Sequence, residues 1–246
     1  MEKKRVRKAE RTGIVGVPLG QDPNYAFHAV AMASDPDPIK GSSFQNIAQH
    51  CVPVLKGDGA RGGRLNLTFR TFSEELPSPS RLECSEKIAL GTNAWLMLWN
   101  GLVSDEQNEK IQACLANTID QHGVADETVV FGKRYTNRGR MAVDMAHKAG
   151  FEYRYAGKTI TGIEWPPLIQ EVVLPRVAEL FGVDSDTIWA HLVYYPIPDC
   201  KLGWHDDGED GINPHFILSL TYLEDPEKPR TFQVRLKKKK KKKNKV

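Results

Sequence analysis

The chain has 246 residues, of which 40% are hydrophobic, 9% aromatic and 26% charged, a composition that suits a globular core and excludes a disordered chain. The formal net charge of +3 is unevenly distributed, because residues 1–11 carry +4 and residues 235–246 carry +9, which leaves −10 on the span between them. An acidic body with two basic ends excludes a uniformly basic nucleic-acid clamp, although the ends can bind phosphates or act as a nuclear address.

The sequence contains no signal for export or membrane insertion. The first residues, MEKKRVRKAER, lack the apolar stretch of a secretory signal, and no run of about eighteen apolar residues could span a bilayer. Four cysteines without a CxxC pair exclude a zinc knuckle and indicate reduced thiols, buried by default. We therefore expect an intracellular protein, cytoplasmic or nuclear, without a membrane partner.

The first strong β signal in chain order is the segment RLNLTFR at residues 64–70. Its strict alternation predicts a strand with an apolar face and a polar face. The polar face consists of Arg64, Asn66, Thr68 and Arg70.

Composition divides the chain into parts. Residues 73–94 are rich in Pro and Ser and predict a linker between an N-terminal part, 12–72, and a longer part, 95–236. The lysine-rich tail at 237–246 is expected to stay disordered because like charges repel.

Two helices are predicted in the longer part. One begins at Ser104, where S-D-E-Q fits a capping box, and the other runs from Pro166 to Phe181 with Gly182 as its stop. Pro175 is expected to kink or divide the second helix. Strands are predicted at 187–195, 215–223 and 230–236. Many strands and few helices predict a mainly β fold, a sandwich or barrel with helices against one face.

The sharpest local motif is Gly203-Trp-His-Asp-Asp-Gly-Glu209. In an extended backbone His205 and Asp207 point the same way, as two ligands of a 2-His-1-carboxylate iron site would. Alone, this H-x-D pair is more typical of a solvated loop than of a metal site.

The surrounding sequence resembles the core of AlkB-type 2-oxoglutarate/Fe(II) dioxygenases. The resemblance covers the stretch from Tyr194 through H-x-D-x-E to Glu209, then FILSLT at 216–221 and RTFQVR at 230–235. Upstream, FEYRYAG at 151–157 and EWPP at 164–167 resemble the substrate-side region of that family, and RMAV at 140–143 resembles its nucleotide-recognition lid.

The distal half of the family pattern is found at the N-terminus instead of the C-terminus. Residues 49–53, QHCVP, and 64–70 resemble it, and residues 25–32 correspond to the strand before the iron histidine. The resemblance thus implies one catalytic domain with a double-stranded β-helix (jelly roll) in circularly permuted order, joined through 73–94. Completion in trans between two chains, with self-association, and a rearranged reading frame are the alternatives.

The resemblance implies a set of site residues. Fe(II) would be held by His205, Asp207 and His50, with 2-oxoglutarate and O2 as co-substrates. The 2-oxoglutarate would be bound by Arg64, Asn66, Arg70 and Tyr195, which suits the affinity of guanidinium groups for carboxylates. The sequence departs from the family at Val193, where Asn is common and helps to hold the co-substrate. His191, two residues earlier, is either a core residue or a residue behind the site.

The reaction implied is oxidative demethylation of N-alkylated bases in nucleic acid, presented as a single strand or as a flipped base. Glu209, Arg140, Tyr153 and Tyr155 would then lie at the substrate cleft, although Glu209 is equally consistent with a solvated loop acid. Alternatives are a related dioxygenase acting on a protein or lipid, and a non-catalytic nucleic-acid-binding protein that retains the fold.

Overall fold

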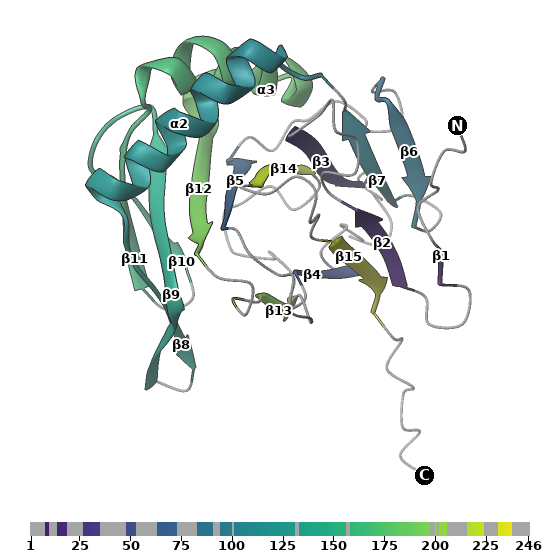
Figure 1. The fold of residues 1–246 in the computed structure, drawn as a ribbon, viewed down its shortest axis with the longest axis horizontal. Helices are drawn as coiled ribbons and strands as arrows, with labels where there is room; N and C mark the ends of the chain where they lie inside the picture. The colour runs from purple at the N-terminus through teal and green to yellow at the C-terminus, as the bar shows by residue number, and fades with distance from the viewer. Residues whose placement is uncertain are drawn as a thin grey trace.

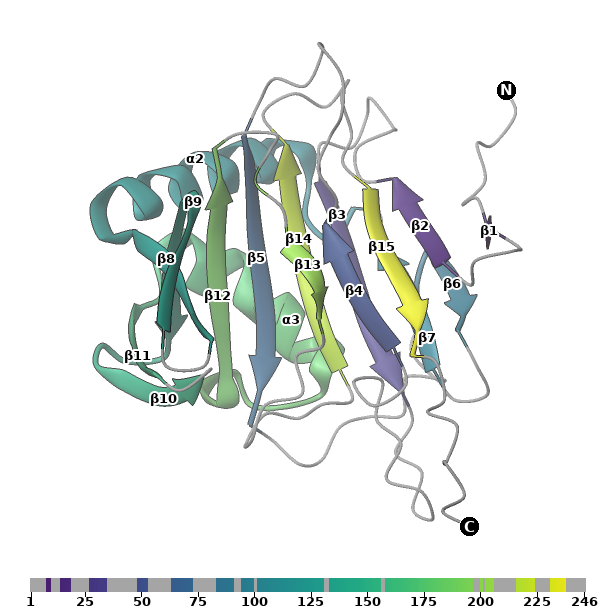
Figure 2. The ribbon, with the colours of Figure 1, turned by 90° about the horizontal axis from the view of Figure 1, so that it is seen from below.

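The protein is mainly β, and its described strands form two sheets with helices against one face of the longer sheet (Figure 1). The computed structural model describes residues 8–9, 14–18, 27–34, 48–52, 63–72, 83–90, 94–99, 101–130, 133–155, 158–196, 200, 202–205, 216–223 and 231–237. Figures 1 and 2 show the short sheet lying against the long sheet on the side away from the helices.

The strands are numbered in chain order. The N-terminal strands are β1 (Lys8–Ala9), β2 (Ile14–Pro18), β3 (Phe27–Ser34), β4 (Ala48–Val52), β5 (Arg64–Thr71), β6 (Glu86–Ala89) and β7 (Ala94–Trp99). The later strands are β8 (Val124–Val130), β9 (Lys133–Ala146), β10 (Phe151–Tyr155), β11 (Lys158–Glu164), β12 (Ile188–Tyr195), β13 (Leu202–His205), β14 (Phe216–Leu223) and β15 (Thr231–Leu236).

The helical segments lie between these two groups of strands and among the later ones. They are α2 (Asp105–His122), the π-helical turn η2 (Ile169–Val173), α3 (Leu174–Phe181) and the short 3-10 turn η3 (Ser185–Thr187). No helix among the described residues is both long and apolar enough to cross a membrane.

Strands from the two ends of the chain alternate within both sheets. The short sheet has the order β1-β2-β15-β4-β13, and the long sheet has the order β10-β11-β9-β12-β5-β14-β3-β7-β6, with β8 paired to β9. The N-terminal strand β5 is therefore inserted between the C-terminal strands β12 and β14, with antiparallel pairing on both sides. The N-terminal strand β4 is inserted in the same way between β15 and β13. Neither sheet can form from one half of the chain alone.

The strand predicted at 64–70 is confirmed as β5, and both of its faces are covered. Its apolar residues Leu65, Leu67 and Phe69 belong to the main core, which they share with residues of α2 and α3. Its polar face looks the other way because side chains alternate along a strand. Arg64 and Arg70 are only 1% and 7% exposed there. The sequence thus places buried charge on the inner side of the sandwich.

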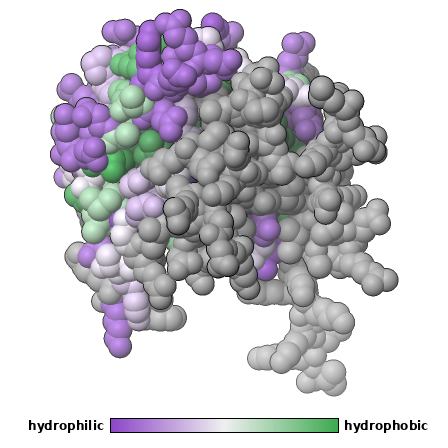
Figure 3. Space-filling view, viewed as in Figure 1, coloured by the Kyte–Doolittle hydropathy of each residue, from purple (hydrophilic) through white to green (hydrophobic). Residues whose placement is uncertain are grey.

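The helix predicted at Ser104 is confirmed, with the complete capping box. The Ser104 hydroxyl accepts from the Gln107 backbone N–H, and the Gln107 side chain accepts from the Ser104 backbone N–H at 3.0 Å. Ile111, Leu115 and Ile119 face the main core. Figure 3 shows that the helical side of the molecule is largely hydrophilic at its surface.

The second predicted helix is divided, as expected from Pro175. A π-helical turn at Ile169–Val173 precedes α3, in which Pro175 occupies the first turn. Proline lacks an N–H and its ring crowds the preceding turn, so a widened turn there accommodates it. Gly182 ends α3 as predicted, with φ 63° in the left-handed conformation that favours glycine.

The strands predicted at 187–195, 215–223 and 230–236 are confirmed as β12, β14 and β15, and the segment at 25–32 falls largely within β3. The linker predicted at 73–94 is wrong in its last part, because residues 86–89 form β6, an edge strand paired with β7. Residues 73–82 lie outside the described residues, as does nearly all of the tail at 237–246. The hairpins β8–β9 and β10–β11 were not predicted from the sequence.

Candidate functional site

Two of the predicted metal ligands, His50 and His205, lie next to each other. His50 is on β4 and His205 is at the end of β13, and the two residues are direct partners in the antiparallel register. Their ring centroids are 4.0 Å apart with the ring planes at 58°. The sheet thus brings two imidazoles together from opposite ends of the chain.

The hydrogen bonding of His205 suits a metal ligand. Its Nδ1 lies 2.8 Å from the backbone carbonyl oxygen of Gly203. A proton on Nδ1 donates to this carbonyl, which leaves Nε2 with its lone pair. His50 is 6% exposed, and its ring stacks on Phe232 of β15 at 5.4 Å. The contacts with Gly203 and Phe232 therefore fix the two rings. Imidazole nitrogens are ligands that suit a divalent transition metal.

The third predicted metal ligand, Asp207, falls outside the described residues, and so does the predicted substrate residue Glu209. Within the described ranges, no group of three or more His, Cys, Asp or Glu side chains is placed to hold a metal ion. The two histidines fit as two of the three predicted ligands, and the third, Asp207, follows β13 in the sequence.

The predicted co-substrate residues share one region of the inner face of the long sheet. Arg64 on β5 is the register partner of Tyr195 on β12. The Arg64 guanidinium carbon lies 4.3 Å from the centroid of the Tyr195 ring. Tyr195 is 2% exposed, so this contact is shielded from water. A guanidinium fixed over an aromatic ring is oriented to bind a carboxylate in a two-pronged way.

Arg70 is held in the same manner at the other end of β5. Its guanidinium carbon lies 5.1 Å from the centroid of the Trp189 ring, and the two residues are also register partners. Arg64 and Arg70 thus each stack on the aromatic residue directly opposite. The structure assigns Arg64, with Tyr195, to one end of this face and Arg70 to the other.

Asn66 is fixed between these two arginines by neighbouring hydroxyl groups. The Thr221 hydroxyl donates to Asn66 Oδ1 at 2.9 Å, and Asn66 Nδ2 donates to the Thr68 hydroxyl oxygen at 2.8 Å. Thr68 and Ser219 exchange a further hydrogen bond at 3.2 Å. An amide nitrogen carries two hydrogens, so Asn66 can donate its second one to a bound carboxylate.

The two positions that the sequence analysis singled out on β12 have different surroundings. Val193 is 3% exposed and lies opposite Asn66 in the register. His191 is half-buried, and its Nδ1 lies 3.0 Å from Oδ1 of Asp144 on β9. His191 is therefore an ion-paired or hydrogen-bonded residue of the inner face. Asp144 was not anticipated from the sequence, although it stands opposite His191 in the register.

Arg140 contacts one of the predicted co-substrate residues, Tyr195. It is 7% exposed and forms a buried ion pair with Asp126. Its guanidinium carbon lies 5.0 Å from the centroid of the Tyr195 ring, so this ring contacts two guanidinium groups. Tyr153 and Tyr155 are on β10, where the strand period places them on one side of the backbone. Their side chains lie outside the described part of the chain.

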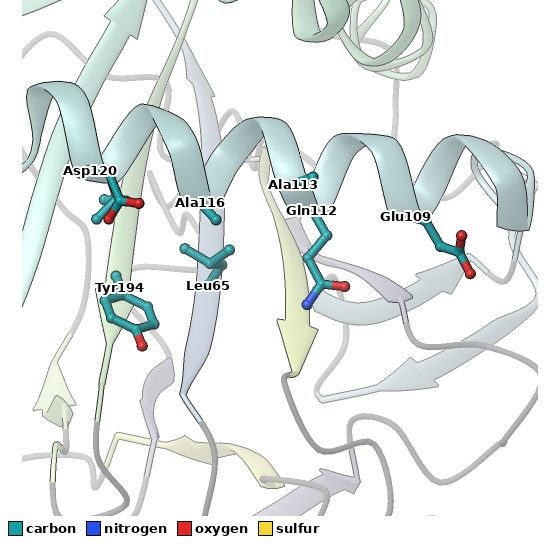
Figure 4. Close-up of a pocket in the computed structure, with 8 residues that line it drawn as sticks. Leu65, Glu109, Gln112, Ala113, Ala116, Asp120 and Tyr194 are labelled. Atoms are coloured by element: carbon teal, nitrogen blue, oxygen red, sulfur yellow. The ribbon is translucent and has the colours of Figure 1, made fainter.

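A pocket of about 480 Å³ lies on the opposite side of the long sheet, beneath α2 (Figure 4). Leu65 and Tyr194 line it from the sheet, and both are the chain neighbours of the predicted co-substrate residues Arg64 and Tyr195. Because side chains alternate across a strand, this pocket and the inner face are separated by the sheet. None of the predicted metal or co-substrate residues is among those that line it.

The four cysteines form no disulfide. Cys51 and Cys200 are buried, as expected for structural thiols, whereas Cys84 and Cys114 are half-buried. Burial raises the pKa of the Cys51 thiol, against the opposing effect of Arg235. Because its pKa is raised, the thiol of Cys51 is a weak nucleophile. Although Cys51 follows His50 on β4, it is therefore not a second reactive group.

Comparisons with models of known protein families, with curated proteins and with solved structures found no match to this chain. The geometry of these residues is thus the basis for assigning a function.

Proposed function

We propose that this protein is a 2-oxoglutarate- and Fe(II)-dependent dioxygenase that oxidatively demethylates N-alkylated bases in nucleic acid. The observation that carries the proposal is the cross-strand pair of His50 and His205. The sequence motifs point to these two histidines in segments that are far apart along the chain. No local pattern requires the two side chains to lie next to each other. An enzyme that uses a metal ion and a di-acid needs metal-binding and cationic side chains in one site. Here the two histidines lie beside a face that holds two buried arginines.

The strand connections support a permuted double-stranded β-helix. From β12 onward, successive strands alternate between the sheets: β12 and β14 are in the long sheet, and β13 and β15 are in the short sheet. The alternation continues from β2 through β3 and β4 to β5, which pairs back with β12. Since β15 also pairs with β2, we propose that these eight strands form a jelly roll in permuted order, with the permutation between β15 and β2.

Circular permutation is tolerated where the original ends are close and the new ends lie at the surface. Both halves pair within one chain here, and we propose this assembly in cis. The domain proposed is therefore a single one that comprises the parts at 12–72 and 95–236.

The proposed roles follow from the contacts of the described residues and, for Asp207, from the family resemblance. His50 and His205, with Asp207, would hold Fe(II), and Arg64, Asn66 and Tyr195 would bind the distal carboxylate of 2-oxoglutarate. Arg70 serves the other end of the same inner face. Bound Fe(II) supplies the oxygen chemistry in which O2 and 2-oxoglutarate yield succinate, CO2 and a hydroxylated N-methyl group, which then leaves as formaldehyde. The buried arginines exclude water from the carboxylate and strengthen its binding.

The substrate class is a proposal that rests on the family resemblance and on the surface next to the site. Glu209, Tyr153 and Tyr155 are proposed to contact the substrate base. The β8–β9 hairpin adds Tyr135, which is 53% exposed and can stack on a base. A flipped or single-stranded base would reach these groups, whereas a base inside a duplex would not.

The test compares substrates as stimulants of 2-oxoglutarate turnover. Purified protein with Fe(II), ascorbate and 2-oxoglutarate is incubated with single-stranded oligonucleotides carrying N-methylated bases, with unmethylated oligonucleotides and with methylated peptides. We expect succinate and formaldehyde to increase together only with the methylated oligonucleotides. Stimulation by the peptides alone would overturn the nucleic-acid part of the proposal. Absence of 2-oxoglutarate turnover and of ligand binding would overturn the enzyme itself.

A further inference from the structure

The β8–β9 hairpin has an inner part that belongs to the long sheet and an outer part that does not. Met141 to Met145 of β9 pair with β12, whereas Lys133 to Thr136 pair with β8. Figure 1 shows the loop end of the hairpin extending below the neighbouring strands. The outer part therefore projects from the sheet, and we call it the β8–β9 arm.

Backbone irregularities in both strands mark the junction between the two parts. On β8 the register shifts between Ala125 and Glu127, which leaves Asp126 at the irregularity. On β9 Gly139 has φ +74°, a conformation that favours glycine. Such irregularities redirect side chains and allow a strand to bend. Asp126 on β8 and Arg140 on β9 both lie at this junction.

The same two side chains connect the arm to the co-substrate residues. Asp126 and Arg140 form an ion pair whose side chains are 10% and 8% exposed. Arg140 then contacts the Tyr195 ring at 5.0 Å, and Tyr195 contacts Arg64 at 4.3 Å. Four side chains from the strands β8, β9, β12 and β5 thereby form one continuous series of contacts.

We propose that Asp126 and Arg140 are positioning residues that couple the orientation of the β8–β9 arm to the order of the Tyr195–Arg64 pair. Arg140 does not read the substrate base, because its guanidinium is buried against Asp126 and Tyr195. A loss of the Tyr195 ring loosens the arm, and a loss of the Asp126–Arg140 pair loosens Tyr195. The coupling is reciprocal, as any coupling between two sites must be.

The part of this inference that concerns a ligand rests on the proposed function. A di-acid bound at Arg64 and Tyr195 orders both side chains. Fixing the arm then costs less conformational entropy, because these two side chains are already ordered. Filling the co-substrate site therefore prepares the arm to receive the substrate. The arm, in turn, increases the affinity for the di-acid when it is held in place.

The first experiment needs no ligand. Hydrogen exchange of the peptide segments within 127–139 is measured in the full chain for wild type, Tyr195→Leu, Asp126→Asn and Arg140→Lys. Tyr194→Leu is the matched control, because Tyr194 is the adjacent residue on the opposite face of the same strand. We expect the arm to exchange roughly tenfold faster in the three variants, from the loss of one aromatic–guanidinium contact or one buried charge pair.

Exchange in α2 reports whether a variant has lost global stability. Should Tyr195→Leu fail to fold, Arg140→Lys still decides, since lysine keeps the charge next to Asp126 but lacks the planar group that stacks on Tyr195. Equal exchange of the arm in wild type and in the folded variants would overturn the coupling. Equal acceleration in Tyr194→Leu would overturn it as well.

The second experiment adds 2-oxoglutarate, with Mn(II) in place of Fe(II). We expect roughly tenfold weaker binding of 2-oxoglutarate in Asp126→Asn, and slower exchange of the arm when 2-oxoglutarate is bound to wild type. Binding that is unchanged in Asp126→Asn would overturn the coupling to the ligand. If wild type binds no 2-oxoglutarate, the proposed function fails, while the ligand-free exchange still tests the contacts between the arm and Tyr195.

Discussion

His50 and His205 are cross-strand partners, although one belongs to the N-terminal part of the chain and the other to the C-terminal part. Their contact depends on β4 being inserted beside β13, at the edge of the short sheet. The pair therefore forms only when both halves of the chain fold together. Any metal affinity that requires both histidines is at the same time a measure of this assembly.

Arg64 is predicted to be the main anchor for the di-acid. Arg64→Lys keeps the charge but loses both the two-pronged geometry and the stacking on Tyr195. We expect the affinity for 2-oxoglutarate to fall by about 1.5–3 kcal/mol, roughly ten- to 150-fold in Kd, measured by calorimetry with Mn(II) present.

The matched control for this substitution is Arg176→Lys, at an exposed arginine of α3 whose partner is Glu179. This control should bind 2-oxoglutarate as wild type does. Equal affinities of wild type and Arg64→Lys would show that the di-acid binds elsewhere.

Asn66 is predicted to stabilise the fold as well as the site. Asn66→Ala removes the acceptor of the buried Thr221 hydroxyl and one of the two side-chain hydrogen bonds of Thr68, which keeps its bond with Ser219. We expect the free energy of unfolding to fall by about 1–3 kcal/mol in urea titrations. Asn117→Ala, at an exposed position of α2, should change it by less than about 0.5 kcal/mol. A similar effect of the two substitutions would contradict the network.

Alkaline pH is predicted to destabilise the protein through Tyr222. This side chain is 1% exposed, and burial strongly raises the pKa of its hydroxyl above the ordinary value of about 10. Above pH 10 the unfolded chain therefore loses a proton that the folded chain keeps. Stability is fully present below that pH and declines by about 1.4 kcal/mol per pH unit above it for this one group.

The measurement is unfolding in urea at pH 8 and at pH values above 10, for wild type and Tyr222→Phe. The substitution should remove this contribution to the pH dependence. The thiols of Cys51, Cys84 and Cys114, whose pKa values are also raised by their burial or partial burial, contribute a loss in the same direction from about pH 9 in both proteins. Tyr135→Phe, at an exposed tyrosine, is the control. A pH dependence that is the same in wild type and Tyr222→Phe would contradict the assignment to Tyr222.

The elements that could be predicted from the sequence are those that are specified by residues close to one another along the chain. The alternation of residues 64–70 and the capping box at Ser104 each depend on neighbours along the chain, and both are observed. The β8–β9 hairpin could not be predicted in this way, because Lys133, Tyr135 and Thr136 in its outer part are exposed and have no buried face to impose alternation. Its inner part is instead specified by pairing with β12, which is distant in sequence.

The candidate site shows the same division. The polar face of β5 could be derived from residue spacing, whereas the partners of its side chains could not. Which aromatic ring lies over Arg64 depends on the register of β12, and the Asp126–Arg140 pair depends on an irregularity in β8. The contact between His50 and His205 was expected only from the family resemblance, since the distance between two strands of different halves has no local signature.

The most direct test is an anaerobic titration of the purified protein with Fe(II) and 2-oxoglutarate, followed by visible absorption. We predict a charge-transfer band of the iron–2-oxoglutarate chelate in wild type and in the control His147→Ala, whose histidine is exposed and distant in sequence from both ligands. The band should be lost in His50→Ala, His205→Ala and Asp207→Ala. A folded wild-type protein without the band, or a band that persists in His50→Ala, would contradict a single iron site built from both halves of the chain.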